Sequence, residues 1–386
     1  MLHEARNVWR GLLWLVAEGQ WWLLPWYVRA KARVRTARLE RRRGTGLSTP
    51  PLGITCRLTM RCNLRCRMCH CVHAQDETAQ RLREVRDMPL ELAKRLVDDV
   101  AGRGTYICFS GGEPLLYEAL GDVFAYARER RVMATMATNA QLLEERAEEL
   151  VERGPKVLSV SVLGPPDVHN ETVCVPDAFQ RLARGIEAVA KAKARRRWTL
   201  PVVVINAPMT DLNTSRLVEL AEVVDDWPIS ALHLQHMWFK PAEALSWQRS
   251  AHRGLLAEEA FAAMGDADED TVDPEALADE IEALIRRPRK RPLAIYPSLT
   301  REQIRRYYQE PMAPLSPEAA LCLWLFTFVH PNGEVSPCEG FNAGNLNEQP
   351  FMDIWNGEKL RDFRRTLCEC GSLPICTRCC VFYRRY

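Results

Sequence analysis

Three cysteines on one short segment are the residues of this sequence best placed to do chemistry. Cys62, Cys66 and Cys69 form the pattern C-x3-C-x2-C directly after a predicted strand. Three thiolates on one loop can bind three irons of a cubane iron–sulfur cluster and leave the fourth iron open to a ligand. A catalytic metal site keeps such an open position, whereas a structural site is closed. For this segment alone, the alternative is a zinc site that borrows His70, Cys71 or His73.

A second motif follows the next predicted strand. Ser110, Gly111, Gly112, Glu113 and Pro114 form a Gly-Gly turn with a carboxylate at the C-terminal end of that strand. A Gly-Gly turn lets the backbone come close to a ligand. Either motif alone would be weak evidence, but the cysteine pattern stands one strand upstream of this turn, and together they point to one site.

These two motifs, in this order, resemble the radical S-adenosylmethionine (radical SAM) superfamily over roughly residues 53–238. The resemblance implies that the open iron chelates the amino and carboxylate groups of SAM. Reduction then breaks the S–C5′ bond, and the 5′-deoxyadenosyl radical abstracts a hydrogen atom. Gly111, Gly112 and Glu113, with Ser110 beside them, would lie at the methionine amino group. We expect a one-electron donor such as flavodoxin or ferredoxin.

Further candidate SAM contacts lie near strand ends. The polar candidates are Asn139, Ser159, Ser161 and Asn206. Each could equally be an ordinary polar residue at a strand end. Met68 is predicted to pack beside the adenine, with a role in the core as its alternative. Leu163 and Val173 stand where the family commonly has an acidic and a basic residue, so contacts from those two positions are not carried over.

Seven of the 14 cysteines lie between Cys322 and Cys380. A hairpin is predicted around Pro331-Asn-Gly333, because Asn-Gly supplies the positive φ angles of a tight turn. Asn345-Leu-Asn, Asp353-Ile-Trp-Asn-Gly357 and a closing C-x2-C follow. The region resembles the SPASM/twitch extension of one branch of the superfamily.

That second resemblance implies one auxiliary [4Fe–4S] cluster, with the ligands Cys322, Cys338, Cys376 and Cys379. One cluster is expected rather than two because the further cysteines of the full SPASM form do not follow Cys380. Cys368 and Cys370 could support a second, incomplete cluster, replace one ligand or take no part. A structural zinc site is the alternative for the whole set.

The remaining pattern predicts the fold. Short β-rich runs alternate with amphipathic helical segments, which is typical of βαβ units around a parallel sheet. Strands are expected at 53–58, 105–109, 132–137, 157–163, 200–205 and 231–236, and helices at 90–103, 117–131, 142–153, 178–195 and 214–224. We therefore expect an α/β fold, a partial (β/α)6 barrel with its chemistry at the C-terminal ends of the strands. A small Cys-rich α+β SPASM/twitch-like domain and an N-terminal amphipathic helix complete it.

Four segments are expected: residues 1–51, 52–238, 239–320 and 321–386. The third is interpreted as a charged helical surface insertion, in which eleven acids precede a basic run at 286–291. The net charge of +2 gives no case for nucleic-acid binding. Cysteines in C-x-x-C spacings favour metal ligation in a reducing cytoplasm over disulfides. Cys56, Cys108 and Cys174 are interpreted as small buried hydrophobes.

Residues 8–43 are predicted to lie on a membrane surface, at the inner face of the membrane. An apolar stretch carries the interfacial rings Trp9, Trp14, Trp21, Trp22, Trp26 and Tyr27. The basic run 29–43 follows, with eight Arg or Lys against one acid, and would meet anionic headgroups. The alternative is that this helix packs against the barrel or the C-terminal domain.

Three functions are compatible with these features. The leading one is hydrogen-atom abstraction from a peptide or small-metabolite substrate that leads to dehydrogenation, epimerisation or cross-linking. The second is radical modification of a membrane lipid or isoprenoid, suggested by the N-terminal segment. The third is a non-catalytic iron–sulfur electron carrier, which the open cysteine triad and the G-G-E turn disfavour.

Overall fold

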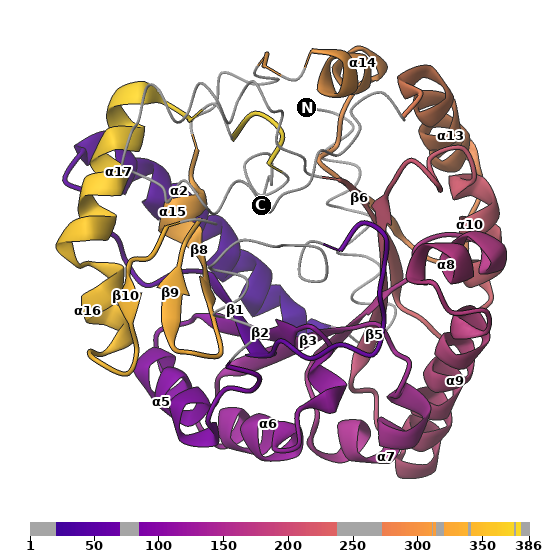
Figure 1. Ribbon diagram of the computed structural model, residues 1–386, viewed down its shortest axis with the longest axis horizontal. Helices are drawn as coiled ribbons and strands as arrows, with labels where there is room; N and C mark the ends of the chain where they lie inside the picture. The colour runs from indigo at the N-terminus through magenta and orange to yellow at the C-terminus, as the bar shows by residue number, and fades with distance from the viewer. Residues whose placement is uncertain are drawn as a thin grey trace.

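The computed structural model describes residues 21–69, 85–237, 272–310, 312–313, 320–338, 341–373 and 376–379. Ten strands form one sheet in the order β10-β9-β8-β1-β2-β3-β4-β5-β6-β7. Eight of them, from β8 through β1 to β7, run parallel, and β8, β9 and β10 pair antiparallel. The parallel strands curl into a barrel wall (Figure 1). The strands are β1 (Gly53–Thr59), β2 (Tyr106–Gly111), β3 (Met133–Thr138), β4 (Val157–Ser161), β5 (Val202–Met209), β6 (Ala231–His236), β7 (Leu293–Tyr296), β8 (Phe326–Val329), β9 (Glu334–Ser336) and β10 (Gly344–Asn345).

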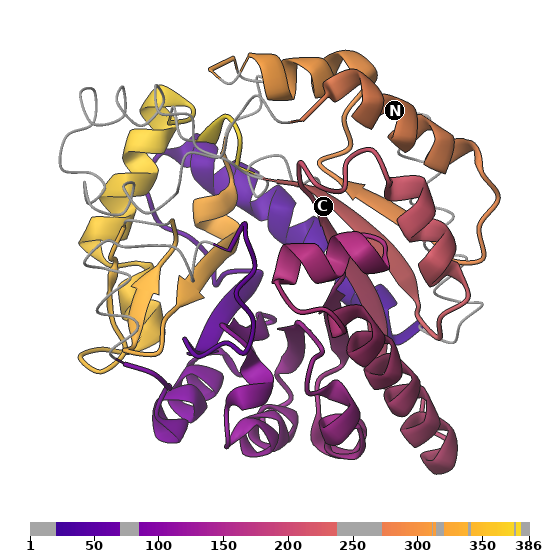
Figure 2. The same ribbon diagram turned by 45° about the vertical axis from the view of Figure 1, so that its right-hand side comes forward.

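Helices cover the outer side of this wall, as Figures 1 and 2 show. The helices of the barrel are α5 (Leu90–Val100), η2 (Pro114–Leu116), α6 (Leu120–Glu129), α7 (Leu143–Arg153), α8 (Pro166–Val173), α9 (Ala178–Arg196), α10 (Leu217–Asp225), α13 (Pro274–Arg286) and α14 (Arg301–Gln309). The C-terminal part adds α15 (Cys322–Leu325), α16 (Phe351–Trp355) and α17 (Glu358–Cys370), and the N-terminal part is η1 (Trp21–Leu23) and α2 (Leu24–Arg43).

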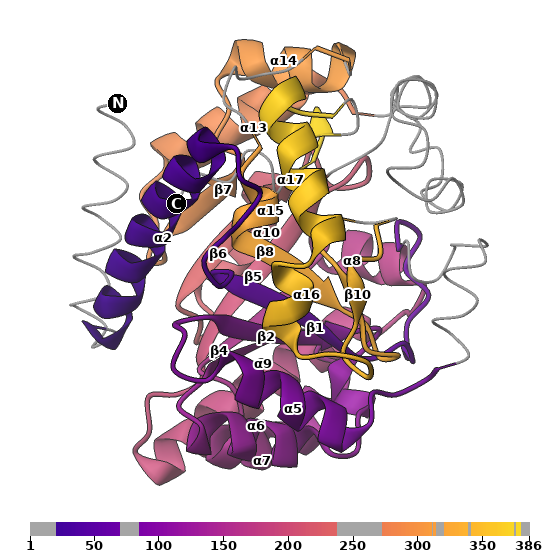
Figure 3. The same cartoon turned by 90° about the vertical axis from the view of Figure 1, so that its left-hand side faces the viewer.

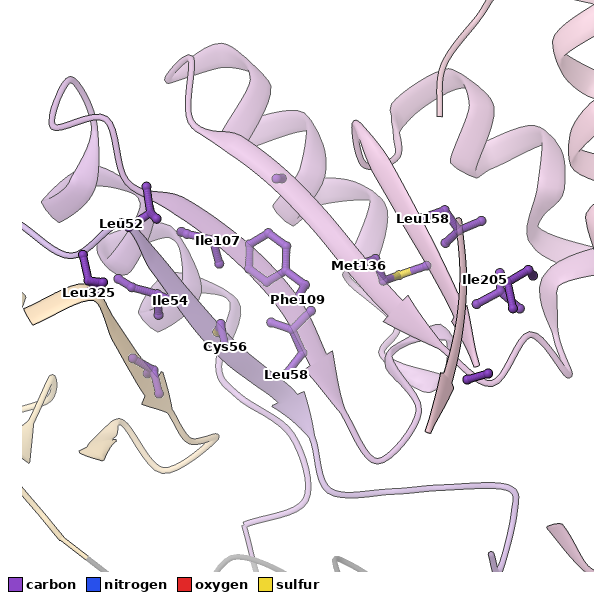
Figure 4. Close-up of a cluster of buried hydrophobic side chains, with 14 of the residues drawn as sticks. Leu52, Ile54, Cys56, Leu58, Ile107, Phe109, Met136, Leu158, Ile205 and Leu325 are labelled. Carbon is purple, nitrogen blue, oxygen red and sulfur yellow. The ribbon is translucent and has the colours of Figure 1, made fainter. Parts of the chain in front are cut away.

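Alternation along the strands separates the core from the interior of the barrel. Ile54, Cys56 and Leu58 of β1 are fully buried on the helix side, where they join the apolar residues of the neighbouring strands (Figure 4). Because successive side chains point to opposite faces of a sheet, Thr55 and Arg57 lie on the inner face, and both are partly exposed. The inner face is therefore available for ligands, while the outer face holds the sheet to its helices.

The predicted fold class is confirmed, with one correction in the stretch 239–320. That stretch was interpreted as a helical insertion, but it contributes β7, which pairs in parallel with β6 and extends the barrel. The four residues of β7 are too few to show a clear alternation beside the charged runs. The basic run is also not simply solvated, because Arg287 pairs with Glu222 and Lys290 with Asp226 of the α10 region.

The N-terminal helix packs on the protein along its described length. The ring of Trp26 lies 5.2 Å from that of Tyr106 at the start of β2, and Val34 and Ala37 are buried in the main core. Further along, α2 contacts α15 and α17, beside which it lies in Figure 3. This is the packing alternative stated above. In the described part of the chain, no helix is long and apolar enough to cross a membrane.

Candidate iron–sulfur and SAM site

The three predicted cluster ligands lie on the loop that leaves the C-terminal end of β1. The start of this loop is held by Arg61, whose guanidinium donates to both carboxylate oxygens of Asp87, at 3.1 and 2.7 Å, and to the carbonyl of Leu116, at 2.7 Å. The Thr59 hydroxyl accepts the N–H of Arg61 at 3.0 Å. These bonds fix the point at which the loop leaves the sheet.

The far side of the loop docks on α8. The N–H of Arg67 donates to the carbonyl of Thr172 at 2.9 Å, and its guanidinium pairs with Glu171 at 2.8 Å. A small apolar cluster lies at this junction. Its buried members are Leu64, Leu163, Val173 and Ala178, and Cys62, Cys66, Met68 and Val175 pack against them.

The two residues that depart from the family pattern, Leu163 and Val173, therefore have a place in this structure. Both belong to the apolar cluster and are almost fully buried. The peptide of Leu163 is fixed on both sides, because its N–H donates to His169 Nδ1 at 3.1 Å and its carbonyl accepts from Asn213 Nδ2 at 2.9 Å. Met68 packs against the same cluster, which matches its core alternative; its predicted place beside the adenine stays a prediction.

The G-G-E turn lies directly against the start of the cysteine loop. The N–H of Gly112 donates to the Thr59 carbonyl at 2.8 Å, and the N–H of Glu113 donates to the Arg61 carbonyl at 2.7 Å. A Cβ on Gly111 would lie 2.1 Å from the Thr59 carbonyl oxygen, and one on Gly112 2.2 Å from that of Arg61. Both glycines are thus required by the contact between two backbone segments.

The Glu113 side chain is fully buried and bonded within the protein. Its Oε1 accepts from the Thr138 hydroxyl at 2.7 Å and the Leu115 N–H at 3.0 Å, and its Oε2 accepts from the Asn139 N–H at 2.7 Å. Burial raises the pKa of Glu113 to about 7, although these three bonds favour the charged form. The carboxylate therefore holds the backbone of Asn139 and of the turn by hydrogen bonds.

Asn139 connects this carboxylate to the cysteine loop. Its side-chain amide donates to Asn63 Oδ1 at 2.9 Å and lies 3.8 Å from the sulfur of Cys62. The chain of contacts from Glu113 through Asn139 to Cys62 means that the second motif supports the first. Both motifs are predicted from the sequence to lie near the methionine part of SAM, but no sequence pattern indicates this link between them.

The other candidate polar residues lie on the inner face of the barrel. Ser110 is the register partner of Arg57, and Ser161 that of Asn206, which in turn pairs with His233 of β6. The side chains of Ser110, Ser161 and Asn206 are partly exposed and lie in the C-terminal halves of their strands. Arg57 and His233 were not singled out from the sequence, although the alternation in β1 and β6 would have placed them on this face.

The thiols suit the predicted cluster. Burial, with the neighbouring Cys62 thiol, raises the pKa of Cys66 to about 11. Without a metal this thiol therefore stays protonated at neutral pH, and binding of a cation such as iron stabilises its thiolate form. None of the cysteines in the described ranges is in a disulfide. The donor set, the loop position and the open edge of the sheet fit an iron–sulfur cluster.

The four predicted auxiliary ligands come together in the C-terminal part. Cys322 begins α15, Cys338 forms a bridge with Phe341 after β9, and the N–H of Cys379 donates to the Cys376 carbonyl at 3.2 Å. The four thiols are near neighbours. Burial, together with the thiols of Cys379 and Cys338, raises the pKa of Cys322. Burial and the other three thiols raise the pKa of Cys376 in the same way. In the described ranges no group of three His, Cys, Asp or Glu side chains is close enough to hold a single metal ion.

The remaining cysteines divide into three cases. Cys368 donates from its thiol to the Arg41 carbonyl at 3.3 Å, and Cys370 is exposed at the end of α17. Cys56 is buried as predicted, and Cys108 is partly exposed on the inner face. The interpretation of Cys174 as a buried hydrophobe is wrong: it is exposed at the end of α8, in a left-handed conformation that closes the helix. Cys380 lies outside the described residues.

Arg378, between two of the predicted auxiliary ligands, ties their segment to the barrel. It is fully buried and donates to the carbonyls of Tyr307 at 2.5 Å, Arg306 at 2.9 Å and Glu310, at the C-terminal end of α14. Unpaired carbonyls at a helix end attract cations. Tyr307 returns a bond from its hydroxyl to the Arg378 carbonyl at 3.0 Å. Nothing in the sequence around Arg378 marks it out from the other arginines.

Two family models match the chain. The radical SAM superfamily matches residues 57–222, and the SPASM iron–sulfur cluster-binding domain matches residues 322–380. The chain belongs to the radical SAM superfamily. Membership implies SAM and a [4Fe–4S] cluster, and the SPASM domain implies auxiliary iron–sulfur chemistry. The structure of Streptococcus suis SuiB bound to S-adenosylmethionine has this fold, with a TM-score of 0.60 and 18% identity over 92% of this chain and 77% of SuiB.

Curated relatives of this radical SAM protein are enzymes. An AdoMet-dependent heme synthase from Methanosarcina barkeri (strain Fusaro) is 27% identical over 354 residues, which are 86% of this chain and 92% of that enzyme. An Fe-coproporphyrin III synthase of the same organism is 36% identical over 131 residues, 33% of this chain and 31% of that enzyme. The chain is therefore a radical SAM enzyme, and the electron-carrier alternative is set aside.

Proposed function

We propose that Cys62, Cys66 and Cys69 hold the [4Fe–4S] cluster that binds SAM, and that the substrate lies on the inner face of the barrel. The bound cofactors supply a 5′-deoxyadenosyl radical that abstracts a hydrogen atom. The observation that carries the proposal is the direct contact between the cysteine loop and the G-G-E turn, through two backbone hydrogen bonds at the C-terminal edge of the sheet. Ser110, Asn139 and Ser161 border the same edge.

Within this site Glu113 is a positioning residue. Its carboxylate is buried and holds the N–H of Asn139, so we assign the contact with the methionine amino group to the backbone of Gly111 and Gly112 rather than to the carboxylate. Asn139 orients its amide toward Asn63 and Cys62. The side chain of Glu113 thereby supports the cluster without touching SAM.

The auxiliary cluster is assigned to Cys322, Cys338, Cys376 and Cys379. Four thiolates close a cluster, so it would transfer electrons rather than bind a substrate atom. The electron that leaves the substrate radical would pass to this cluster, which suits an oxidative outcome such as dehydrogenation. The thiols that act on the pKa values of Cys322 and Cys376 are those of the other predicted ligands, which supports grouping these four cysteines around one auxiliary cluster.

For the substrate we favour a small metabolite over a peptide. One relative, matched over 92% of its own length, is named a heme synthase, and the names of two further relatives include Fe-coproporphyrin III and pre-heme d1. The Arg57 guanidinium on a polar inner face that also carries His233 suits an acidic metabolite of this tetrapyrrole type. A peptide is the second class, motivated by the complex of SuiB with its precursor peptide, a structure that resembles this chain in fold.

SAM cleavage tests the first assignment. Dithionite-reduced wild type, reconstituted without oxygen, should form 5′-deoxyadenosine from SAM and contain about eight irons per chain, as two four-iron clusters require. The C62A/C66A/C69A variant should form none and keep about four. Equal 5′-deoxyadenosine formation by the triple variant, or zinc in place of iron in wild type, would refute the assignment.

The substrate class is tested with the same protein. Fe-coproporphyrin III should raise the yield of 5′-deoxyadenosine above the substrate-free level and undergo a change of mass. The C62A/C66A/C69A variant is the control, because it should form no 5′-deoxyadenosine and leave the porphyrin unchanged. A porphyrin that leaves the yield unchanged would direct the search to peptides.

A membrane-surface role for residues 8–43 remains a proposal of its own. The observation in its favour is that Leu24 and Val28 of α2 are 44% and 59% exposed beside the basic side chains of that helix. Apolar side chains with neighbouring cations favour anionic bilayers. We expect wild type to float with anionic liposomes and release at high salt, and a L24D/V28D variant not to float. A wild type that ignores vesicles would also remove the main reason to consider a lipid or isoprenoid substrate.

A further inference from the structure

Two arginines from distant parts of the chain meet around Cys322. Arg41 of α2 donates to the carbonyls of Ala320 at 3.1 Å, Leu367 at 2.6 Å and Gly371 at 3.0 Å. Arg364 of α17 donates to the carbonyls of Leu323 at 2.9 Å, Gly46 at 3.0 Å and Trp355 at 2.8 Å. One arginine thus bonds the chain two residues before Cys322, and the other bonds it one residue after.

Neither guanidinium forms an ion pair with a carboxylate in the described part of the chain. Arg364 is fully buried over the ring of Trp355, and its Nη2 has no hydrogen-bond acceptor. The carboxylate that acts on the pKa of Arg364 is Glu40, whose oxygens are already bonded by the Ser48 hydroxyl and the Thr49 N–H. Carbonyl dipoles and this shared carboxylate replace only part of the water that the buried Arg364 guanidinium loses.

The groups beside Arg41 are thiols rather than acids. Those of Cys368, Cys370 and Cys322 are the ones that act on its pKa against the effect of burial. Cys322 is a predicted ligand of the auxiliary cluster. A [4Fe–4S] cluster with four thiolate ligands is anionic, and its negative charge grows on reduction, so its potential depends on the charges around it. An anionic cluster bound at Cys322 would lie beside both guanidinium groups, of which Arg41 is partly exposed and Arg364 is fully buried.

We propose that Arg41 and Arg364 form a cationic clamp on Cys322, which holds this ligand and stabilises the reduced state of the auxiliary cluster. The inference rests on the proposed function, since it needs the cluster at the four cysteines. It gives the N-terminal helix a role that is independent of membranes: α2 delivers a positive charge to the electron-accepting site.

The test is a redox titration, followed by EPR, of the full chain in the C62A/C66A/C69A background, where only the auxiliary cluster remains. R41Q removes the charge, and R41K keeps it. R42Q is the matched control, because Arg42 is the next residue of α2 and is exposed, so water screens its charge. We expect R41Q to weaken one-electron reduction about tenfold, which is a fall of about 59 mV in midpoint potential. R42Q and R41K should stay near the parent value.

Each outcome has a defined meaning. Loss of the cluster from R41Q but not from R41K would also support the clamp, because charge is then what retains the cluster. An unchanged potential in R41Q with its iron intact, or an equal fall in R42Q, would overturn it. Loss of iron from both R41Q and R41K would overturn it as well, since the charge would then not suffice. A parent without auxiliary iron would instead refute the four-cysteine assignment, and that result is seen before any arginine is changed.

Discussion

Replacement of Glu113 by Gln tests the link between the two motifs most directly. All three groups bonded to this carboxylate are donors, and two of them are backbone N–H groups that cannot turn away. The amide of a Gln must place its NH2 group where one oxygen now accepts. The less costly choice is the Oε2 position, because Oε1 accepts two bonds and Oε2 accepts one. The N–H of Asn139 then faces another donor.

The size of the effect follows from that geometry. One hydrogen bond to a charged acceptor is lost, worth about 1.5–3 kcal/mol, and a buried N–H is left unsatisfied at about 1–3 kcal/mol. The smaller cost of burying a neutral amide offsets part of this, because burial disfavours the charged carboxylate. The free energy of unfolding should fall by about 2–4 kcal/mol. Asn139 should loosen, and with it the segment around Cys62.

Two measurements on E113Q check this reasoning. Urea unfolding of the anaerobic protein, followed by circular dichroism, gives the stability loss, and the rate of 5′-deoxyadenosine formation reports the site. E118Q is the control, because Glu118 is exposed on the same segment and should lose neither. If E113Q is as stable as wild type yet cannot cleave SAM, the carboxylate contacts the cofactor directly and the positioning role assigned to it is wrong.

Three further results are expected. Gly112→Ala should abolish binding of the SAM-cleaving cluster, measured as loss of about four irons per chain, because its Cβ would lie 2.2 Å from the Arg61 carbonyl oxygen; normal iron content would contradict the close contact. Burial lowers the pKa of His169 to about 4, so the unfolded chain binds a proton on this histidine at a higher pH than the folded chain does. Between pH 7 and pH 5 the free energy of unfolding of wild type should therefore fall by about 2 kcal/mol through this residue. H169N should not show this fall, and urea unfolding at both pH values measures it. Deletion of residues 1–45 should lower the thermal midpoint, because Val34 and Ala37 leave the core, and a midpoint equal to that of wild type would refute the packing of α2.

The parallel strands could be predicted because their signal is local. Runs such as 53–58 and 231–236 have β-rich composition and stand between amphipathic helices, so period and composition agree. β7 could not be predicted in the same way. It is four residues long, all partly exposed, and lies between a charged helix and a charged loop, so that only its pairing with β6 defines it as a strand.

In the site, too, local features could be predicted from the sequence and non-local contacts could not. Cysteine spacing and the G-G-E turn can be read from the sequence, because residue type and interval carry the information. The support around them is non-local. Arg41 meets Leu367 across 326 residues, and Asn139 meets Cys62 across 77. No interval in the sequence points to such contacts, and Arg41 looks like any other arginine of its basic run until the fold bonds it to three carbonyl groups.

The apolar cluster beneath the cysteine loop shows what the departures at two family positions mean physically. A charged residue at position 163 or 173 would have to be accommodated among Leu64, Ala178 and the side chains packed on them. In this chain Leu163 and Val173 instead pack against the loop as apolar side chains. The hydrogen bonds at position 163 are made by its backbone, which the side chains of His169 and Asn213 bind. The loop is therefore held by packing on one side and by Asn139 and the G-G-E turn on the other.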